Sequence, residues 1–139
     1  MRSNMSIVFQ QHHLIPGLTL LQNVELSWCL SGRKGELTPT EVLDELGIGE
    51  ERYSLPESVS GGQAQRAAIA RSLVTGSQLV FADEPTGSLD IENAQAVMVQ
   101  MKSLCQQRGG HALVVTHDHD IAATCDRILV LAEGTIRHG

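Results

Sequence analysis

Short apolar runs, each followed by polar residues, divide the chain into predicted strands. The run ending at Phe9 is followed by Gln10, the next by Asp83 and Glu84, and a third by His117. Continuous apolar runs are typical of strands buried on both faces of a parallel sheet, and we expect this burial for the second and third runs. The predicted strands occupy residues 6–9, 79–82, 112–116 and 127–132, with a short final strand after the turn at 133–134.

Helical patterns separate these strands. Between residues 90 and 107, apolar side chains recur at spacings of three and four: Ile91, Ala94, Val97, Met98, Met101, Leu104 and Cys105. This spacing predicts an amphipathic helix. Thr38 and Glu41 form a capping-box pattern around Pro39, and Ser60 stands as an N-cap before the apolar, alanine-rich residues 67–74. Two further helices are expected, over residues 19–30 and from Asp118 to Cys125.

The order of these elements predicts an α/β fold with a mostly parallel sheet and a small helical subdomain. We place the helical subdomain at about residues 19–75. The sheet core then takes about residues 1–18 and 76–139. The whole chain forms one partial domain.

Composition limits the kinds of protein that fit. Of the 139 residues, 42% are hydrophobic and 3% aromatic, so the core must be aliphatic and rich in alanine. The net charge of -6 argues against a nucleic-acid binder, which is usually basic. Three cysteines without metal-type spacing indicate reduced thiols in a cytosolic protein. No apolar run approaches the roughly 18 residues that cross a bilayer, so any membrane role requires a partner and not direct insertion.

The turn Ser60-Gly61-Gly62 has the chemistry of a phosphate site. Glycine permits a tight turn, and the free N–H groups of the helix that follows carry partial positive charge. Such a helix start binds phosphate without a lysine. An ordinary capped helix is the alternative, and Ser-Gly-Gly alone favours it because short glycine turns are common.

Asp83 and Glu84 follow an apolar strand, at the sheet edge where open α/β sheets bind ligands. A carboxylate at this position can hold Mg²⁺, and its neighbour can orient or deprotonate a water. A solvated strand end is the alternative. His12 and His13 could suggest a metal site, but no other ligands are placed to complete one. A metal cluster is also an alternative interpretation of His117-Asp118-His119.

Five segments in order resemble the motifs of ABC transporter ATPases. Residues 9–14 resemble the Q-loop, 60–63 the signature, 79–84 the Walker B strand, 88–90 the D-loop and 114–118 the switch-histidine strand. The stretches 10–16 and 83–90 are most similar to the lipoprotein-releasing and macrolide-export branch. The resemblance implies a P-loop NTPase core that uses ATP and Mg²⁺.

The same resemblance implies a role for each motif residue. Glu84 is the general base or water-orienting residue, Asp83 holds Mg²⁺, and Gln10 contacts both metal and water. His117 contacts the γ-phosphate side. The signature residues act on nucleotide held by a partner across a head-to-tail homodimer or heterodimer: Ser60, Gly61, Gly62 and Gln63. The D-loop residues connect the two sites: Ser88, Leu89 and Asp90. The helical subdomain contacts a transmembrane permease at the cytoplasmic face of the inner membrane.

A phosphate loop of the form G-x-x-x-x-G-K-[ST] is absent from the sequence. In the family this loop precedes the Q-loop, so we interpret the chain as N-terminally truncated. It should bind ATP poorly alone, expose strand edges and be marginally stable. A non-catalytic interaction module that keeps the signature and permease-contacting surfaces is the alternative. A soluble ABC ATPase of repair or translation is disfavoured by the acidic charge and by residues 10–16.

Overall fold

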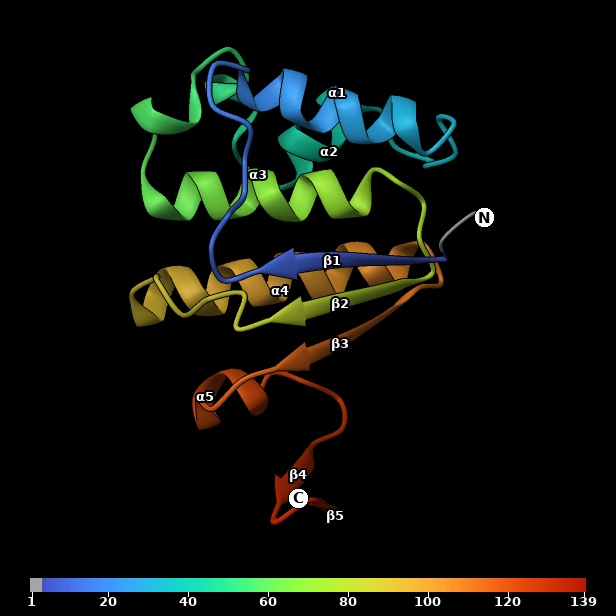
Figure 1. The fold of residues 1–139 in the computed structure, drawn as a ribbon, viewed down its shortest axis with the longest axis vertical. Coiled ribbons are helices and arrows are strands. Elements are labelled where there is room, and N and C mark those ends of the chain that lie inside the picture. The colour runs from blue at the N-terminus through green and yellow to red at the C-terminus, as the bar shows by residue number, and fades with distance from the viewer. Residues whose placement is uncertain (1–3) are drawn as a thin grey trace.

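A computed structural model describes residues 4–139 (Figure 1). Its elements follow one another in this order: β1 (Met5–Phe9), α1 (Leu20–Leu30), α2 (Pro39–Glu45), the single-turn helices η1 (Gly49–Glu51) and η2 (Pro56–Ser58), α3 (Gly61–Leu73), β2 (Leu79–Asp83), α4 (Ile91–Gln107), β3 (His111–Val115), α5 (His119–Ala122), β4 (Leu129–Ala132) and β5 (Thr135–His138). The predicted strands and helices are therefore present, with small shifts at their ends.

The central sheet has three parallel strands in the order β1-β2-β3. Helix α4 covers one face of the sheet, and α1, α2 and α3 gather beside β1 (Figure 1). The strands β1, β2 and β3 all end at one edge of the sheet. Helices α3 and α4 begin at that same edge. This arrangement confirms the predicted α/β class with a mostly parallel sheet.

Local capping positions the helices as the sequence predicts. The Thr38 hydroxyl accepts from the backbone N–H of Glu41, whose carboxylate accepts from the backbone of Thr38, and Ser60 and Gln63 form the same reciprocal pair. Each box satisfies N–H groups that have no partner within the helix. A third box at the start of α1 pairs Thr19 with Gln22.

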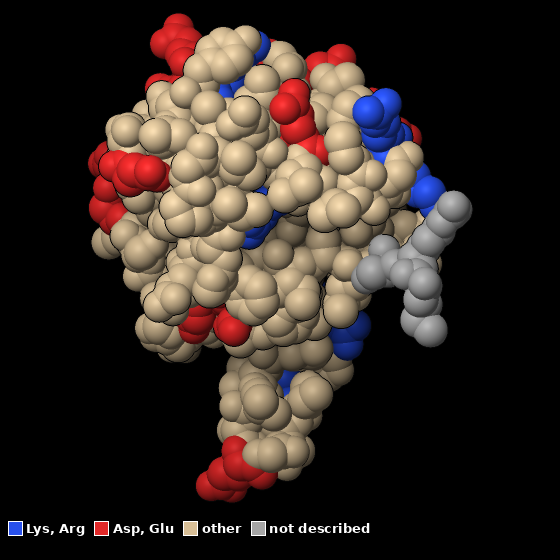
Figure 2. Space-filling view, turned by 45° about the horizontal axis from the view of Figure 1, so that its top comes forward, with Lys and Arg blue, Asp and Glu red and all other residues tan. Residues whose placement is uncertain are grey.

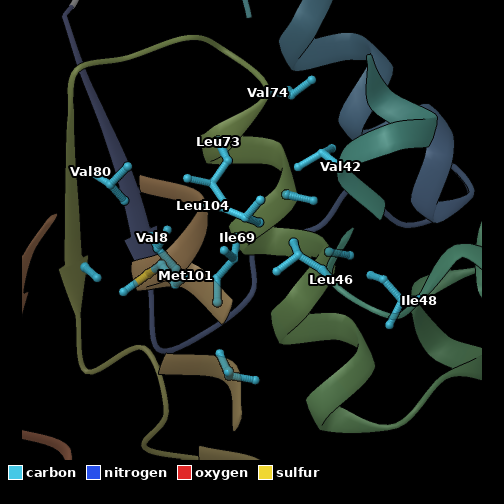
Figure 3. Packing of buried hydrophobic residues seen from close by; sticks show 14 of the residues in the cluster. Val8, Val42, Leu46, Ile48, Ile69, Leu73, Val74, Val80, Met101 and Leu104 are labelled. Atoms are coloured by element: carbon cyan, nitrogen blue, oxygen red, sulfur yellow. The ribbon is translucent and has the colours of Figure 1, made fainter. Parts of the chain in front are cut away.

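The core lies between the sheet and helices α3 and α4 and continues into the helical layer (Figure 3). Val8 and Val80 project from the sheet towards Ile69 of α3 and Met101 of α4. The largest buried side chains are aliphatic or methionine, apart from Gln65. The expectation of an aliphatic core is confirmed. Because this core is continuous, the boundary of the helical subdomain stays a prediction.

The prediction that the strands are buried on both faces is wrong. In β2, Val80 and Ala82 are buried, whereas Leu79 and Phe81 on the opposite face are partly exposed. On that same face, Ile7 is 43% exposed and Leu113 is 48% exposed. Among residues 4–139, helices pack against one face only, so apolar side chains that alternate to the other face meet solvent.

The last two strands form a separate antiparallel hairpin. Glu133 and Gly134 at its turn have φ values of 51° and 75°, which suits a tight two-residue connection. All residues of β4 and β5 are exposed, and the hairpin projects from the body of the molecule (Figures 1 and 2). The predicted strand at 127–132 therefore exists but lies outside the central sheet.

Candidate functional site

Strand register brings the ends of the three parallel strands together. Phe9, Asp83 and Val115 are register partners across the sheet. Gln10, Glu84 and Thr116 therefore leave the strands side by side, with His117 one residue further. The predicted Q-loop, Walker B and switch-histidine residues meet at one edge because the strands are parallel and in register.

Glu84 occupies an unusual backbone conformation. Its φ is +46°, in the left-handed region that non-glycine residues rarely adopt, and its N–H donates to the carbonyl of Val115 at 2.8 Å. This turn directs the Glu84 side chain towards the end of β3. Its carboxylate accepts from the Thr116 hydroxyl at 3.3 Å and from the backbone N–H of His117 at 3.0 Å.

The His117 ring makes a further contact to the same carboxylate. Nδ1 of His117 lies 2.7 Å from Oε1 of Glu84. The hydrogen bond to Glu84, and then the attraction of its negative charge, raise the pKa of the His117 imidazole above its ordinary value. The Glu84 side chain is 22% exposed and the His117 side chain 88% exposed, so the rest of the ring faces solvent.

Gln10 lies against the turn that follows Glu84. A Cβ atom built on Gly87 would be 2.7 Å from Nε2 of Gln10, so the glycine permits this close approach. The turn is closed by the N–H of Gly87, which donates to the carbonyl of Glu84 at 3.2 Å. The structure therefore places Gln10 next to the carboxylate end of the site.

Helix α3 holds the loop that follows Gln10. The Arg71 guanidinium donates to the carbonyls of His13 at 2.7 Å and His12 at 3.0 Å. The fully buried Gln65 contacts Nδ1 of His12 at 2.6 Å and donates to the carbonyl of Phe9. Burial lowers the pKa of the Arg71 guanidinium from its ordinary value. The loop and α3 are thus joined by polar contacts at several points.

The signature turn lies at the open start of α3. Ser60 and Gly61 are exposed, and a Cβ atom built on Gly61 would meet nothing within 4 Å. Packing inside the chain therefore does not require a glycine at position 61. A Cβ atom on Gly62 would lie 3.8 Å from Leu89, so the signature turn and the D-loop segment are neighbours.

The D-loop segment leads into α4. Asp90 caps the helix by accepting from the N–H of Asn93 at 2.8 Å and from its side-chain amide at 2.7 Å. These bonds, the backbone one first, hold the pKa of the Asp90 carboxyl below its ordinary value. Ser88 is exposed and Leu89 is partly buried. A small cavity of about 120 Å³ lies between this segment, Glu84 and His117.

The residues present fit a magnesium ion that is shared with nucleotide phosphates. Asp83 is exposed at the end of β2. No cluster of three or more His, Cys, Asp or Glu side chains in residues 4–139 is arranged to hold a metal by itself. Protein-bound Mg²⁺ commonly uses only one or two carboxylates together with phosphate and water oxygens. A single exposed carboxylate such as Asp83 meets that requirement when phosphate and water oxygens supply the other ligands.

Sequence reasoning missed several residues of the site. Thr116, Gln65 and Arg71 were not singled out, although each contacts a predicted site residue or its loop. Arg71 had a detectable signal, because a charged residue within an apolar helical run needs a polar partner when it is buried. Thr116 lies within the predicted switch-histidine segment 114–118, but no local pattern indicates its hydrogen bond to Glu84.

Charged side chains are scattered over the face in view in Figure 2, where separated acidic and basic groups lie on a mostly uncharged surface. None of the helices described in residues 4–139 has the length and apolar character needed to cross a bilayer.

Comparison with known proteins identifies the family. The ABC transporter family matches residues 1–87. The lipoprotein-releasing system ATP-binding protein LolD of Shewanella frigidimarina is 37% identical over 96% of this chain and 57% of its own length. The macrolide export ATP-binding/permease protein MacB of Photorhabdus laumondii is 41% identical over 97% of this chain and 21% of its own length.

A solved structure supports the same conclusion. The ATP-binding cassette MJ0796, in a dimeric post-hydrolysis state bound to ADP and Pi, superposes with a TM-score of 0.82 and 34% identity. The match covers 99% of this chain and 63% of that chain. This chain thus spans less than two thirds of the length of each of these relatives. It belongs to the ABC transporter family.

Proposed function

We propose that the chain forms part of the ATP-hydrolysing subunit of an ABC transporter and couples hydrolysis to a membrane permease. The observation that carries this proposal is the register of Phe9, Asp83 and Val115. It brings Gln10, the two carboxylates and His117 to one edge of the sheet. The exposed start of α3 lies at the same edge (Figure 1).

Glu84 is suited to orient or deprotonate an attacking water. A carboxylate has about four acceptor positions on its two oxygens. Oε1 accepts twice from His117, and Oε2 accepts once from Thr116. One acceptor position therefore remains on Oε2 for a water, while the other bonds keep the carboxylate in place.

His117 and Gln10 supply polar contacts on the phosphate side. The Glu84 carboxylate favours a proton on Nδ1 of His117, which leaves Nε2 on the exposed side of the ring. An imidazolium there would donate to a phosphate oxygen. Asp83 and Gln10 would hold Mg²⁺, which neutralises charge on the transferred phosphoryl group.

The signature residues would act on nucleotide held by a partner cassette. Gly61 is exposed, and a Cβ atom built on it would meet nothing within 4 Å, so this side of the turn is accessible to a phosphate group that the N–H groups of Gly61 and Gly62 would bind. Gln63 completes the cap with Ser60. Asp90, at the start of α4, would connect this half-site to the carboxylate edge. This arrangement requires a second ATPase domain, either a copy of this chain or a related one.

A non-catalytic interaction module is the second candidate. It is favoured by one observation: the 139 residues contain no G-x-x-x-x-G-K-[ST] segment. In this function the chain keeps the signature half-site and the permease-contacting helices, and the nucleotide is held and hydrolysed by a partner domain.

A titration with Mg·ATP and a measurement of ATP turnover distinguish the ATPase from the interaction module. We would add Mg·ATP to ¹⁵N-labelled chain in the presence of a related ATPase domain that contains a phosphate loop, follow the amide resonances of Gly61 and Gly62, and measure phosphate release. Shifts at both glycines, with turnover abolished by Glu84→Gln, support the ATPase. Shifts without turnover favour the interaction module. Turnover that survives Glu84→Gln overturns the role of Glu84. Glycine resonances that stay unchanged when the related domain and Mg·ATP are both present overturn the signature half-site.

A transporter role also implies a location and a partner. The relatives are named as an ATP-binding protein of a lipoprotein-releasing system and an ATP-binding/permease protein for macrolide export. We assign this chain to the cytoplasmic face of the inner membrane, bound to a permease. Fractionation of cells that express the tagged chain tests this: it should be recovered with membranes and leave them at alkaline pH. Recovery in the soluble fraction alone contradicts it.

A further inference from the structure

Glu51 contacts the signature turn from outside its helix. Oε1 of Glu51 accepts a hydrogen bond of 3.1 Å from the Nε2 group of Gln63. The second oxygen, Oε2, is buried and has no hydrogen-bond partner within residues 4–139. A buried acceptor without a donor costs free energy. Because the unsatisfied oxygen does not stabilise the fold, it indicates that Glu51 has a role other than stability.

The contact determines how the Gln63 amide is oriented. An ionised carboxylate only accepts hydrogen bonds, so the NH₂ group of Gln63 must face Glu51. The amide oxygen then faces the backbone N–H of Ser60, from which it accepts at 2.9 Å. With the amide reversed, its oxygen would face the carboxylate and the N–H of Ser60 would lose its acceptor.

The Ser60 hydroxyl belongs to the same reciprocal cap. Its oxygen accepts from the backbone N–H of Gln63 at 3.2 Å. The hydroxyl hydrogen is therefore free to point away from the helix. Together with the N–H groups of Gly61 and Gly62, it provides a third donor for a phosphate group.

Glu51 is held by a segment other than α3. Its carbonyl accepts from the N–H of Ser54 at 2.9 Å. The neighbouring Arg52 and Ser54 carbonyls accept from Leu21 and Leu20, both at 2.9 Å, at the start of α1. The carboxylate thus approaches Gln63 from a backbone that is fixed to the helical layer.

We infer that Glu51 is a positioning residue of the signature half-site. It orients the Gln63 amide, Gln63 fixes the backbone of Ser60, and the Ser60 hydroxyl and the two glycine amides are thereby arranged for phosphate. This inference rests on the proposed function of the signature turn. The negative charge of Glu51 opposes anion binding nearby, so its contribution comes from orientation.

Substitutions at position 51 distinguish the effect of side-chain length on phosphate binding from the effect of negative charge. Glu51→Asp keeps the charge but shortens the side chain, and Glu51→Gln removes the charge but keeps an acceptor at the same reach. We expect Glu51→Asp and Glu51→Ala to weaken Mg·ATP binding at the signature turn about tenfold, the loss expected when one orienting hydrogen bond is removed. Glu51→Gln should bind as tightly as the unmodified chain. Glu57→Ala, at an exposed glutamate of η2, is the matched control.

The measurement is a ¹⁵N titration of each folded variant with a related ATPase domain that contains a phosphate loop and is saturated with Mg·ATP, read at Gly61 and Gly62. A thermal unfolding curve is recorded for each variant. Unmodified affinity in both Glu51→Asp and Glu51→Ala overturns the inference, as does Glu51→Gln binding as weakly as Glu51→Asp. If Glu51→Ala does not fold, the Asp and Gln variants decide. If the unmodified chain shows no response at the two glycines, the proposed function of the signature turn is wrong. That outcome differs from the outcomes that overturn the role of Glu51.

Discussion

Glu84 and His117 are joined by two hydrogen bonds: the carboxylate accepts from the ring at 2.7 Å and from the backbone N–H of the same histidine at 3.0 Å. The two residues follow neighbouring parallel strands whose ends are in register. The pair links the proposed water-orienting group to the proposed phosphate-contacting group. A change in the protonation of His117 therefore alters both.

The pair predicts a pH dependence. Because Glu84 raises the pKa of His117 in the folded chain, the contribution of this pair to folding stability is fully present below the ordinary histidine pKa of about 6.5. This contribution is lost as the pH rises through the folded-state pKa. Glu84→Gln should lower the His117 pKa, as measured by NMR titration of the ring. Glu133→Gln, on the distant hairpin turn, is the control and should leave the titration unchanged.

Two glycines should respond in opposite ways to alanine. A Cβ at Gly61 meets nothing within 4 Å, so Gly61→Ala should leave stability unchanged or raise it by about 0.5 kcal/mol. A Cβ at Gly35 would lie 2.2 Å from the carbonyl oxygen of Val74, so Gly35→Ala should lower the unfolding temperature clearly. Thermal unfolding by circular dichroism measures both. A large loss in Gly61→Ala would show that this glycine has a packing role.

Adjacent residues of β1 test the uncovered sheet face. Val8 is 1% exposed, and Val8→Ser should lower the free energy of unfolding by about 3 kcal/mol through lost burial and a buried hydroxyl. Ile7 is 43% exposed on the other face, and Ile7→Ser should cost about 1 kcal/mol or less. Urea unfolding gives both values. Equal costs would mean that both faces of the sheet are covered in solution.

The same open face should bind an apolar dye. Exposed contiguous apolar surface is a common site of association. We expect the folded chain to bind such a dye, and Ile7→Ser combined with Leu113→Ser to reduce the fluorescence. Val99→Ser, at a 60% exposed position of α4, is the control. Fluorescence that does not depend on Ile7 and Leu113 would contradict the prediction.

The contact between Arg71 and the loop after Gln10 should contribute to stability. Arg71→Ala removes two charge-assisted hydrogen bonds to backbone carbonyls and should cost about 2 kcal/mol, measured by urea unfolding. Arg33, whose guanidinium lies 5.2 Å from the centre of the Trp28 ring, is the matched control. Arg33→Ala should cost about 1 kcal/mol or less. Similar costs for the two variants would remove the special role of Arg71.

Much of the fold was readable from residues close together in the chain. The capping boxes at Thr38 and Ser60 join residues three positions apart, and the helix that follows Asp90 repeats its apolar positions every three or four residues. The ordered motifs also identified the family and placed Gln10, Glu84 and His117 at strand ends. These features depend on local geometry, which short segments specify.

The remaining features depend on partners distant in the chain. An apolar strand does not reveal which of its faces a helix will cover, and here Val80 is buried while Phe81 is partly exposed. Nor does a helix start reveal that Glu51 will approach Gln63 from η1. Sequence patterns established the elements, their order and the candidate chemistry of this chain. Which side chains face one another was decided by packing, because burial and side-chain hydrogen bonds depend on groups that come together only in the folded chain.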